Sequence, residues 1–192
     1  ELLDRLELIS PNNTFFTDLR KTILNNDQFA LFRLLQQQTS SQLVEGLRKY
    51  KDNTEFNADC FSRGQLESKL WLVKELQKTK VDLGTVFLCA GWYATLATML
   101  FESSITVDKI RSFDIDDTCR DIAETFNKPW VKDNWKFKSS TKDIMDINYE
   151  FERYEVIRAD GTTCPLDDTP DTIINTSCEH IENFEEWYAK IP

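Results

Sequence analysis

The residues of this sequence that could do chemistry stand in four short segments, each directly after a stretch with the pattern of a β-strand. The segments are residues 90–94 (Ala-Gly-Trp-Tyr-Ala), 114–117 (Asp-Ile-Asp-Asp), 141–144 (Thr-Lys-Asp-Ile) and 175–180 (Asn-Thr-Ser-Cys-Glu-His). In open α/β sheets, ligands bind beyond the carboxyl ends of the strands, where the strand order reverses. If the four strands are parallel, we therefore expect these segments to form one binding site.

The first two segments have the residue types of an adenosine-binding site. Small residues at Ala90 and Gly91 let the backbone approach a ligand where the next helix begins, although an ordinary strand-to-helix turn explains them equally well. Asp114 stands 24 residues beyond Ala90, where an acidic side chain can accept hydrogen bonds from both ribose hydroxyls. The alternative is an acid that caps the next helix, a role that fits Asp116 or Asp117 better.

The third segment offers a contact for an adenine ring. Asp143 can accept a hydrogen bond from the adenine amino group, and Ile144 can cover the ring. An ordinary loop acid is an equally good interpretation of Asp143.

The fourth segment holds the candidates for acid–base chemistry. His180 is the only histidine, and the ordinary pKa of an imidazole suits a general base, although a lone histidine is more often structural. Glu179 is a second candidate base. Cys178 is a weaker candidate nucleophile because the sequence names no base to orient it. Asn175 either contacts the reacting groups or ties its side chain to the backbone at the end of its strand.

The elements that must position these segments alternate between strand and helix. We predict strands over 85–90, 109–113, 135–138 and 172–175, and helices over 93–101, 117–126 and 182–190. Strands joined by helical crossovers form a parallel sheet, so the fold class is α/β, with a Rossmann-like sheet in the order 3-2-1-4. An insertion over 154–170 carries the turn signal Ala159-Asp160-Gly161, which predicts a small β-hairpin.

The residues before the sheet are predicted to be helical. Residues 1–58 form a helical N-terminal region, with apolar residues at helical spacing, and residues 59–192 form the Rossmann-like core. An amphipathic helix over 64–78 precedes the first strand.

Composition limits the classes of function. The net charge of −10 argues against extended binding to nucleic acid, which needs a basic face. No apolar run approaches the roughly 18 residues of a membrane span, and the first residues lack a secretory signal. Five scattered cysteines and one histidine predict reduced thiols in the cytoplasm and no metal site.

The ordered segments resemble the motifs of class I S-adenosylmethionine-dependent methyltransferases. The resemblance covers roughly residues 60–192 and rests on residues 86–97, 113–116, 143 and 171–175. It is closest to an uncharacterised group from bacteriophage and environmental sequences, which has a similar Gly-Trp-Tyr turn and Asn-Thr-Ser-Cys-Glu-His run. The cytoplasm of a phage host is then the expected compartment.

The resemblance implies a cofactor, S-adenosyl-L-methionine, and an unidentified methyl acceptor. The implied cofactor-binding residues are Ala90, Gly91, Trp92, Tyr93, Asp114, Ile115, Asp143, Ile144 and Asn175. Arg63 or Gln65 of the upstream helix would bind the cofactor carboxylate, or simply belong to a helix start capped by Ser62. Asn175, Glu179 and His180 are the implied catalytic residues.

Two departures from the family pattern leave alternatives open. The family's first motif usually has glycines at alternating positions, which here are Ala90, Trp92 and Ala94. The class also continues into further strands, so we expect strand four to be an edge, covered by a protein partner or by missing C-terminal strands. Both departures favour a catalytically inactive binding or assembly module as the alternative. A nicotinamide-dependent oxidoreductase fits less well because the G-x-G-x-x-G pattern is absent.

Overall fold

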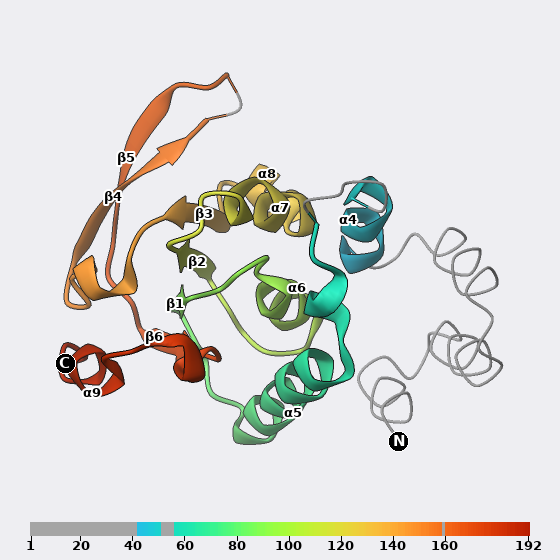
Figure 1. The fold of residues 1–192 in the computed structure, drawn as a ribbon, viewed down its shortest axis with the longest axis horizontal. Helices are drawn as coiled ribbons and strands as arrows, with labels where there is room; N and C mark the ends of the chain where they lie inside the picture. Colours follow the sequence, from blue (N-terminus) through green and yellow to red (C-terminus); the bar gives the residue numbers. More distant parts are fainter. Residues whose placement is uncertain (1–41, 51–55, 159) are drawn as a thin grey trace, which may run out of the picture. The chain divides into compact units, whose positions relative to one another are not determined.

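The computed structural model describes residues 42–50, 56–158 and 160–192, and the chain divides into two compact units, residues 1–80 and 81–192 (Figure 1). The division lies after residue 80, whereas the sequence pattern places a boundary between 58 and 59. The helices expected within residues 1–41 lie outside the described residues. Among the described helices, none is long and apolar enough to span a lipid bilayer.

The described part of the first unit is helical. It consists of α4 (Gln42–Tyr50), the short 3-10 helix η1 (Ala58–Phe61) and α5 (Arg63–Thr79). Ser62 caps α5 by accepting a hydrogen bond from the Gln65 amide at 3.5 Å, and Lys80, which follows the last residue of the helix, has a left-handed backbone. The amphipathic helix predicted over 64–78 is confirmed.

The second unit is built on a four-stranded parallel sheet. Its strands are β1 (Thr85–Cys89), β2 (Lys109–Asp114), β3 (Phe137–Thr141) and β6 (Thr172–Asn175), in the order β3-β2-β1-β6. Helices α6 (Thr95–Glu102), α7 (Cys119–Phe126) and α8 (Lys128–Lys132) lie in the crossovers between the first three strands. The α/β class with a parallel sheet is confirmed and is consistent with a Rossmann-like fold. The predicted order 3-2-1-4 is corrected to 3-2-1-6, because two hairpin strands precede the last strand of the sheet.

The insertion forms the expected antiparallel hairpin, with strands longer than the sequence pattern indicates. Strands β4 (Glu152–Ile157) and β5 (Thr163–Asp168) pair with each other and not with the main sheet, and in Figure 1 they project beyond it. Alternate residues of β4 are buried, so one face of the hairpin packs inward and the other faces solvent.

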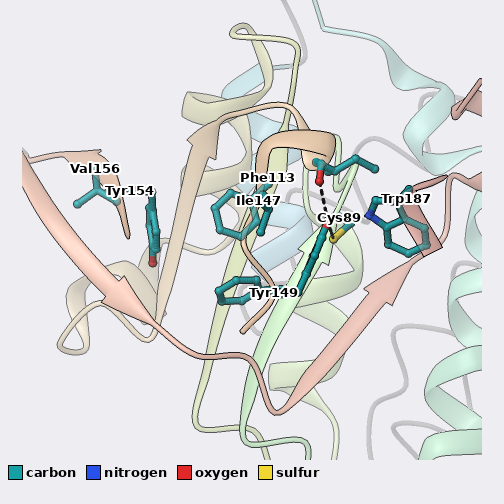
Figure 2. Close-up of a cluster of buried hydrophobic side chains, with 9 residues drawn as sticks. Cys89, Phe113, Ile147, Tyr149, Tyr154, Val156 and Trp187 are labelled. Atoms are coloured by element: carbon teal, nitrogen blue, oxygen red, sulfur yellow. Dashed lines mark hydrogen bonds between the residues drawn. The ribbon is translucent and has the colours of Figure 1, made fainter. Parts of the chain in front are cut away.

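The hairpin and the C-terminal segment cover one face of the sheet, and α6 and α7 lie on the other (Figure 1). The register brings Phe87 level with Arg111 and Ile173 on the hairpin side. A hydrophobic cluster fills this side, with most of its members drawn in Figure 2. Its buried residues are Phe87, Cys89, Phe113, Ile144, Ile147, Tyr149, Tyr154, Val156 and Trp187. Trp187 belongs to α9 (Phe184–Tyr188), the helix expected over 182–190.

Two local differences from the predicted elements have a clear cause. Strand β3 begins at Phe137 and not at Trp135, because Asn134 and Trp135 have positive φ angles of 50° and 54° and form a turn. Helix α8 is not among the predicted elements, and it has Pro129 in its first turn. Proline is well tolerated in the first turn, where its missing N–H would be unpaired in any case.

Candidate binding site at the carboxyl edge of the sheet

The carboxyl ends of β1 and β6 lie side by side, and the strand order reverses between them. Cys89 pairs with Asn175 in the register, while β2 and β3 follow on the other side of β1. The hydroxyl of Ser177 donates to the Ala90 carbonyl at 3.1 Å, which ties the segment after β6 to the segment after β1. This is the position at which open α/β sheets bind ligands.

The loop after β1 holds three non-glycine residues in the left-handed conformation. The φ angles are 49° at Ala90, 50° at Trp92 and 49° at Ala94. This conformation costs an L-residue roughly 1–2 kcal/mol relative to its ordinary backbone, and such residues cluster at functional sites. These are the alternating positions at which the methyltransferase motif usually has glycine. Glycine takes such φ angles without strain, so the backbone at these three positions has a conformation that favours glycine although none of them is a glycine.

The carboxylate of Asp114 holds this loop in place. Its Oδ2 accepts from the Trp92 amide at 2.7 Å, and its Oδ1 accepts from the Asp116 amide at 3.0 Å. Its carbonyl also accepts from the Lys142 amide at 2.9 Å, which joins the third segment to the second. Each carboxylate oxygen can accept a second hydrogen bond. The bonds to the loop therefore leave capacity for a ligand hydroxyl.

Gly91 is required because the loop passes close to β2. A Cβ at this position would lie 2.2 Å from Ser112 Oγ and 3.1 Å from Leu88 Cγ. The Ser112 hydroxyl is buried and has no hydrogen-bond partner within the described part of the chain. Gly91 is not among the residues with positive φ, so the position does not need the backbone freedom of glycine. It needs glycine because there is no room for a side chain.

Aromatic and apolar side chains flank the loop. The Trp92 and Tyr93 rings stack with centroids 4.9 Å apart and an angle of 28° between their planes. Tyr93 is buried, whereas Trp92 stays partly exposed. Ile115, directly after Asp114, is 72% exposed, a high value for a large aliphatic residue. Ile115 is thus available to contact a ligand.

The two predicted residues of the third segment, Asp143 and Ile144, differ in how far they are exposed to solvent. Asp143 is partly exposed, and its Oδ1 accepts from the Met145 amide at 2.8 Å, as the N-cap of the 3-10 helix η2 (Ile144–Asp146). Ile144 is only 7% exposed and belongs to the hydrophobic cluster, where its carbonyl accepts from the Tyr149 hydroxyl at 2.9 Å. The side chain of Ile144 therefore serves the core in this structure.

The cluster beneath this segment includes a polar network whose ionisable groups are kept protonated by burial. The Tyr149 hydroxyl also accepts from Trp187 Nε1 at 2.7 Å and lies 3.5 Å from Cys89 Sγ. Burial raises the pKa of Cys89 to about 12 and raises the pKa of Tyr149 as well. Both groups are therefore expected to be protonated near neutral pH.

Asn175 has one satisfied and one unsatisfied polar atom. Its Oδ1 accepts from the Ser177 amide at 2.9 Å. This is the hydrogen bond to the backbone that the sequence predicts as one of two alternatives for Asn175. Its Nδ2 is buried and has no hydrogen-bond partner among the described residues. Buried donors nearly always have partners, so this amide marks a place for a ligand atom or an ordered water.

The predicted bases lie in the solvent. The His180 and Glu179 side chains are 76% and 65% exposed, and their Nε2 and Oε1 atoms are 3.6 Å apart. They belong to the short 3-10 helix η3 (Cys178–His180). Cys178 is exposed too. Nothing around these side chains in the described part of the chain isolates them from water.

The remaining predicted residues belong to the first unit. Gln65 lies in α5, where its side-chain oxygen accepts a hydrogen bond from the Lys69 ammonium group. Arg63 is the first residue of the same helix. In the described ranges, no group of three or more His, Cys, Asp or Glu side chains is arranged to hold a metal ion.

Sequence reasoning missed the contribution of Ser177. Its hydroxyl joins the two strands at the switch point, yet serine in a loop carries no distinctive signal. The only hint was its place two residues after a strand end, where short polar side chains commonly bond to backbone.

Comparisons with protein-family models, with curated proteins and with solved structures find no match for this chain. A functional assignment must therefore come from the residues at the carboxyl edge of the sheet.

Proposed function

We propose that this chain is a methyltransferase that uses S-adenosyl-L-methionine and transfers its methyl group to an unidentified acceptor. The observation that carries the proposal is the left-handed backbone at Ala90, Trp92 and Ala94. These are the alternating positions at which class I methyltransferases usually have glycine, and they lie at the switch point of a parallel sheet. A loop kept in this conformation at an energetic cost indicates selection for a function other than stability.

The residues at this edge fit the proposed cofactor. Asp114 would hold the ribose hydroxyls with its remaining acceptor capacity, and Asp143 would hold the adenine amino group. Ile115 is exposed where an apolar residue would contact the adenine ring. The unsatisfied Asn175 Nδ2 offers a hydrogen bond to the acceptor or to the cofactor.

The bound cofactor would supply a methyl group on a sulfonium, which transfers by in-line displacement. The chain then has to position the acceptor and exclude water. Asn175, fixed through its Oδ1, is the side chain best placed for positioning. His180 and Glu179 would act as a base only for an acceptor that loses a proton, and only if a bound acceptor shields them from solvent.

A catalytically inactive binding or assembly module is the second candidate. The exposure of His180 and Glu179 favours it, because no base in the described part of the site is shielded from water. Such a module would keep the fold without transferring a methyl group, whether or not it still binds the cofactor.

Calorimetric titration with S-adenosylmethionine and S-adenosylhomocysteine tests the proposal. We expect the wild-type chain to bind both. Asp114→Asn should bind at least ten-fold more weakly, because a charge-assisted hydrogen bond to the ribose is lost. Asp117→Asn, three residues away and exposed, is the matched control and should bind like the wild type. The absence of heat at millimolar ligand would contradict the proposal.

The two candidates separate in a second experiment. Incubation with cofactor labelled in its methyl group, together with a fractionated cell extract, should transfer label to an acceptor. A chain that binds the cofactor in the titration but transfers no label to any fraction would be the inactive module.

A further inference from the structure

We infer that Trp92 is a stacking platform for a planar heteroaromatic ring of the bound ligand. The inference deepens the proposed function and rests on it for the location of the ligand at this edge of the sheet. The ring is either the adenine of the cofactor or a heteroaromatic methyl acceptor, and both present the same π-face.

The backbone of Trp92 is the first reason. A bulky residue with a φ of 50° is an outlier, and glycine would take this conformation without strain. The Asp114 carboxylate holds the Trp92 amide at 2.7 Å and so fixes the residue in its strained position. A large side chain kept on a glycine-type backbone calls for a role that glycine cannot fill.

The setting of the indole is the second reason. One face of it lies against the Tyr93 ring, at 4.9 Å and 28°, and Tyr93 itself is only 4% exposed. A buried ring thus supports one face of the indole, while Trp92 as a residue remains partly exposed. A partly exposed aromatic ring with a rigid support is the arrangement with which proteins stack bases, and each such contact contributes substantially to affinity.

The position at the switch point is the third reason. The neighbours of Trp92 in the chain are fixed to both adjacent strands, since the Gly91 amide donates to the Phe113 carbonyl at 3.1 Å and the Ala90 carbonyl accepts from Ser177. The indole is therefore carried by a loop anchored on both sides of the expected ligand position. The loop backbone that carries the indole is therefore fixed in place before a ligand binds.

The opposite role for the same side chain would be to fill the site and exclude a cofactor. The two roles predict opposite effects of Trp92→Gly, a substitution that the left-handed backbone accommodates. Loss of a platform weakens binding by about five-fold to a hundred-fold, whereas loss of a plug strengthens it.

The experiment follows the indole N–H signals of the full chain, labelled with ¹⁵N, by NMR. The chain has five tryptophans, and Trp92→Phe identifies the signal of Trp92 by its absence. We expect S-adenosylhomocysteine to shift this signal. Binding should weaken five-fold to a hundred-fold in Trp92→Gly and change only a few-fold in Trp92→Phe. Trp71→Phe, at an exposed position of α5, is the control and should bind like the wild type.

Further titrations show whether the stacked ring is adenine or the methyl acceptor. They also distinguish failure of the Trp92 platform from failure of the methyltransferase proposal. A shift caused by adenosine alone assigns the platform to adenine, and a shift caused by other nucleosides only after saturation with S-adenosylhomocysteine assigns it to the acceptor. If S-adenosylhomocysteine binds equally well or better to Trp92→Gly, the platform is overturned and the methyltransferase proposal stands. If only free nucleosides shift the Trp92 signal, the platform stands and the cofactor proposal fails. If no planar ligand shifts it, the platform is overturned.

Discussion

Glu152 and Asp168 face each other across the antiparallel pair of β4 and β5, and both carboxylates are buried. Each has its own cationic partners. Glu152 pairs with Lys142, from the segment after β3, and Asp168 pairs with Lys109 and Arg111 of β2. The base of the hairpin is therefore fixed to the sheet through two neutralised carboxylates, one of them adjoining the candidate site.

The first prediction concerns Asp168. Asp168→Asn should lower the free energy of unfolding by about 3–5 kcal/mol, because it leaves the buried Arg111 guanidinium without its carboxylate. The matched control is Asp167→Asn, which breaks the exposed pair with Arg153 and should cost less than about 1 kcal/mol. Urea unfolding followed by circular dichroism measures both, and equal losses in the two variants would contradict the anchoring role.

The second prediction concerns pH. Burial by itself raises the pKa of Asp168, but hydrogen bonds from Lys109, Tyr154 and Arg111 outweigh burial and hold the pKa below its ordinary value of 3.8. A carboxyl whose pKa is lowered on folding adds stability above its unfolded pKa, and this stability is lost as the pH falls through the folded pKa. The urea concentration at the midpoint of unfolding of the wild type should therefore decrease as the pH drops below about 4.

The control for this pH effect is the same pair of variants. Asp168→Asn should lose less stability than the wild type between pH 5 and pH 3, whereas Asp167→Asn should follow the wild type more closely. Parallel pH profiles for Asp168→Asn and the wild type would show that other carboxyls cause the acid sensitivity.

Most of the sheet could be predicted because its strands carry an unambiguous pattern. Residues 85–89 form a continuous apolar run, as expected for a strand buried on both faces, and helical spacing marks α5 and α7. The predicted start of β3 at Trp135 was wrong, because tryptophan is common in strands but Trp135 lies in a left-handed turn. That turn is stabilised from outside the segment, since Arg111 donates to the Trp135 carbonyl at 2.7 Å, and a local pattern does not contain such a contact.

The third prediction concerns the polar network that joins α9 to the hydrophobic cluster. Tyr149→Phe removes the hydroxyl that accepts from Trp187 Nε1 and donates to the Ile144 carbonyl. Two buried polar groups then lack partners, so we expect a loss of roughly 1–3 kcal/mol in the free energy of unfolding. Tyr188→Phe, at an exposed position of the same helix, should change stability by less than about 0.5 kcal/mol. Urea unfolding distinguishes them, and an unchanged midpoint in Tyr149→Phe would rule out the contribution of the network.

The candidate site was harder to predict than the fold because its side chains have more than one use. Asp114 was expected to face a ligand, and the structure shows its carboxylate also holding two backbone amides. Ile144 was expected to cover a ring and lies in the core instead, while Ile115, also named as a candidate, is exposed. The sequence determines which residues follow each strand, but the direction of each side chain depends on the neighbouring loops.

The fourth prediction tests the close approach of the loop to β2. Gly91→Ala should destabilise the chain by about 1–3 kcal/mol, because its Cβ would lie 2.2 Å from Ser112 Oγ. Ser112→Ala alone should be neutral or slightly stabilising, since it removes a buried hydroxyl that has no partner in the ranges that the structure describes. The double variant should recover part of the loss, with the contact to Leu88 limiting the rescue. Additive effects in this double-mutant cycle would show that the two residues do not meet.

The fifth prediction tests the strain in the loop itself. Ala90→Gly should raise the free energy of unfolding by about 0.5–1 kcal/mol, because relief of the left-handed backbone exceeds the extra entropy that glycine gives the unfolded chain. Ala97→Gly, inside α6, is the control and should lose at least about 1 kcal/mol, since its backbone is helical. Thermal unfolding should therefore move in opposite directions for the two variants. If Ala90→Gly were also destabilising, the contacts of the Ala90 methyl group would outweigh the strain, and the loop would not be kept in its left-handed conformation at an energetic cost.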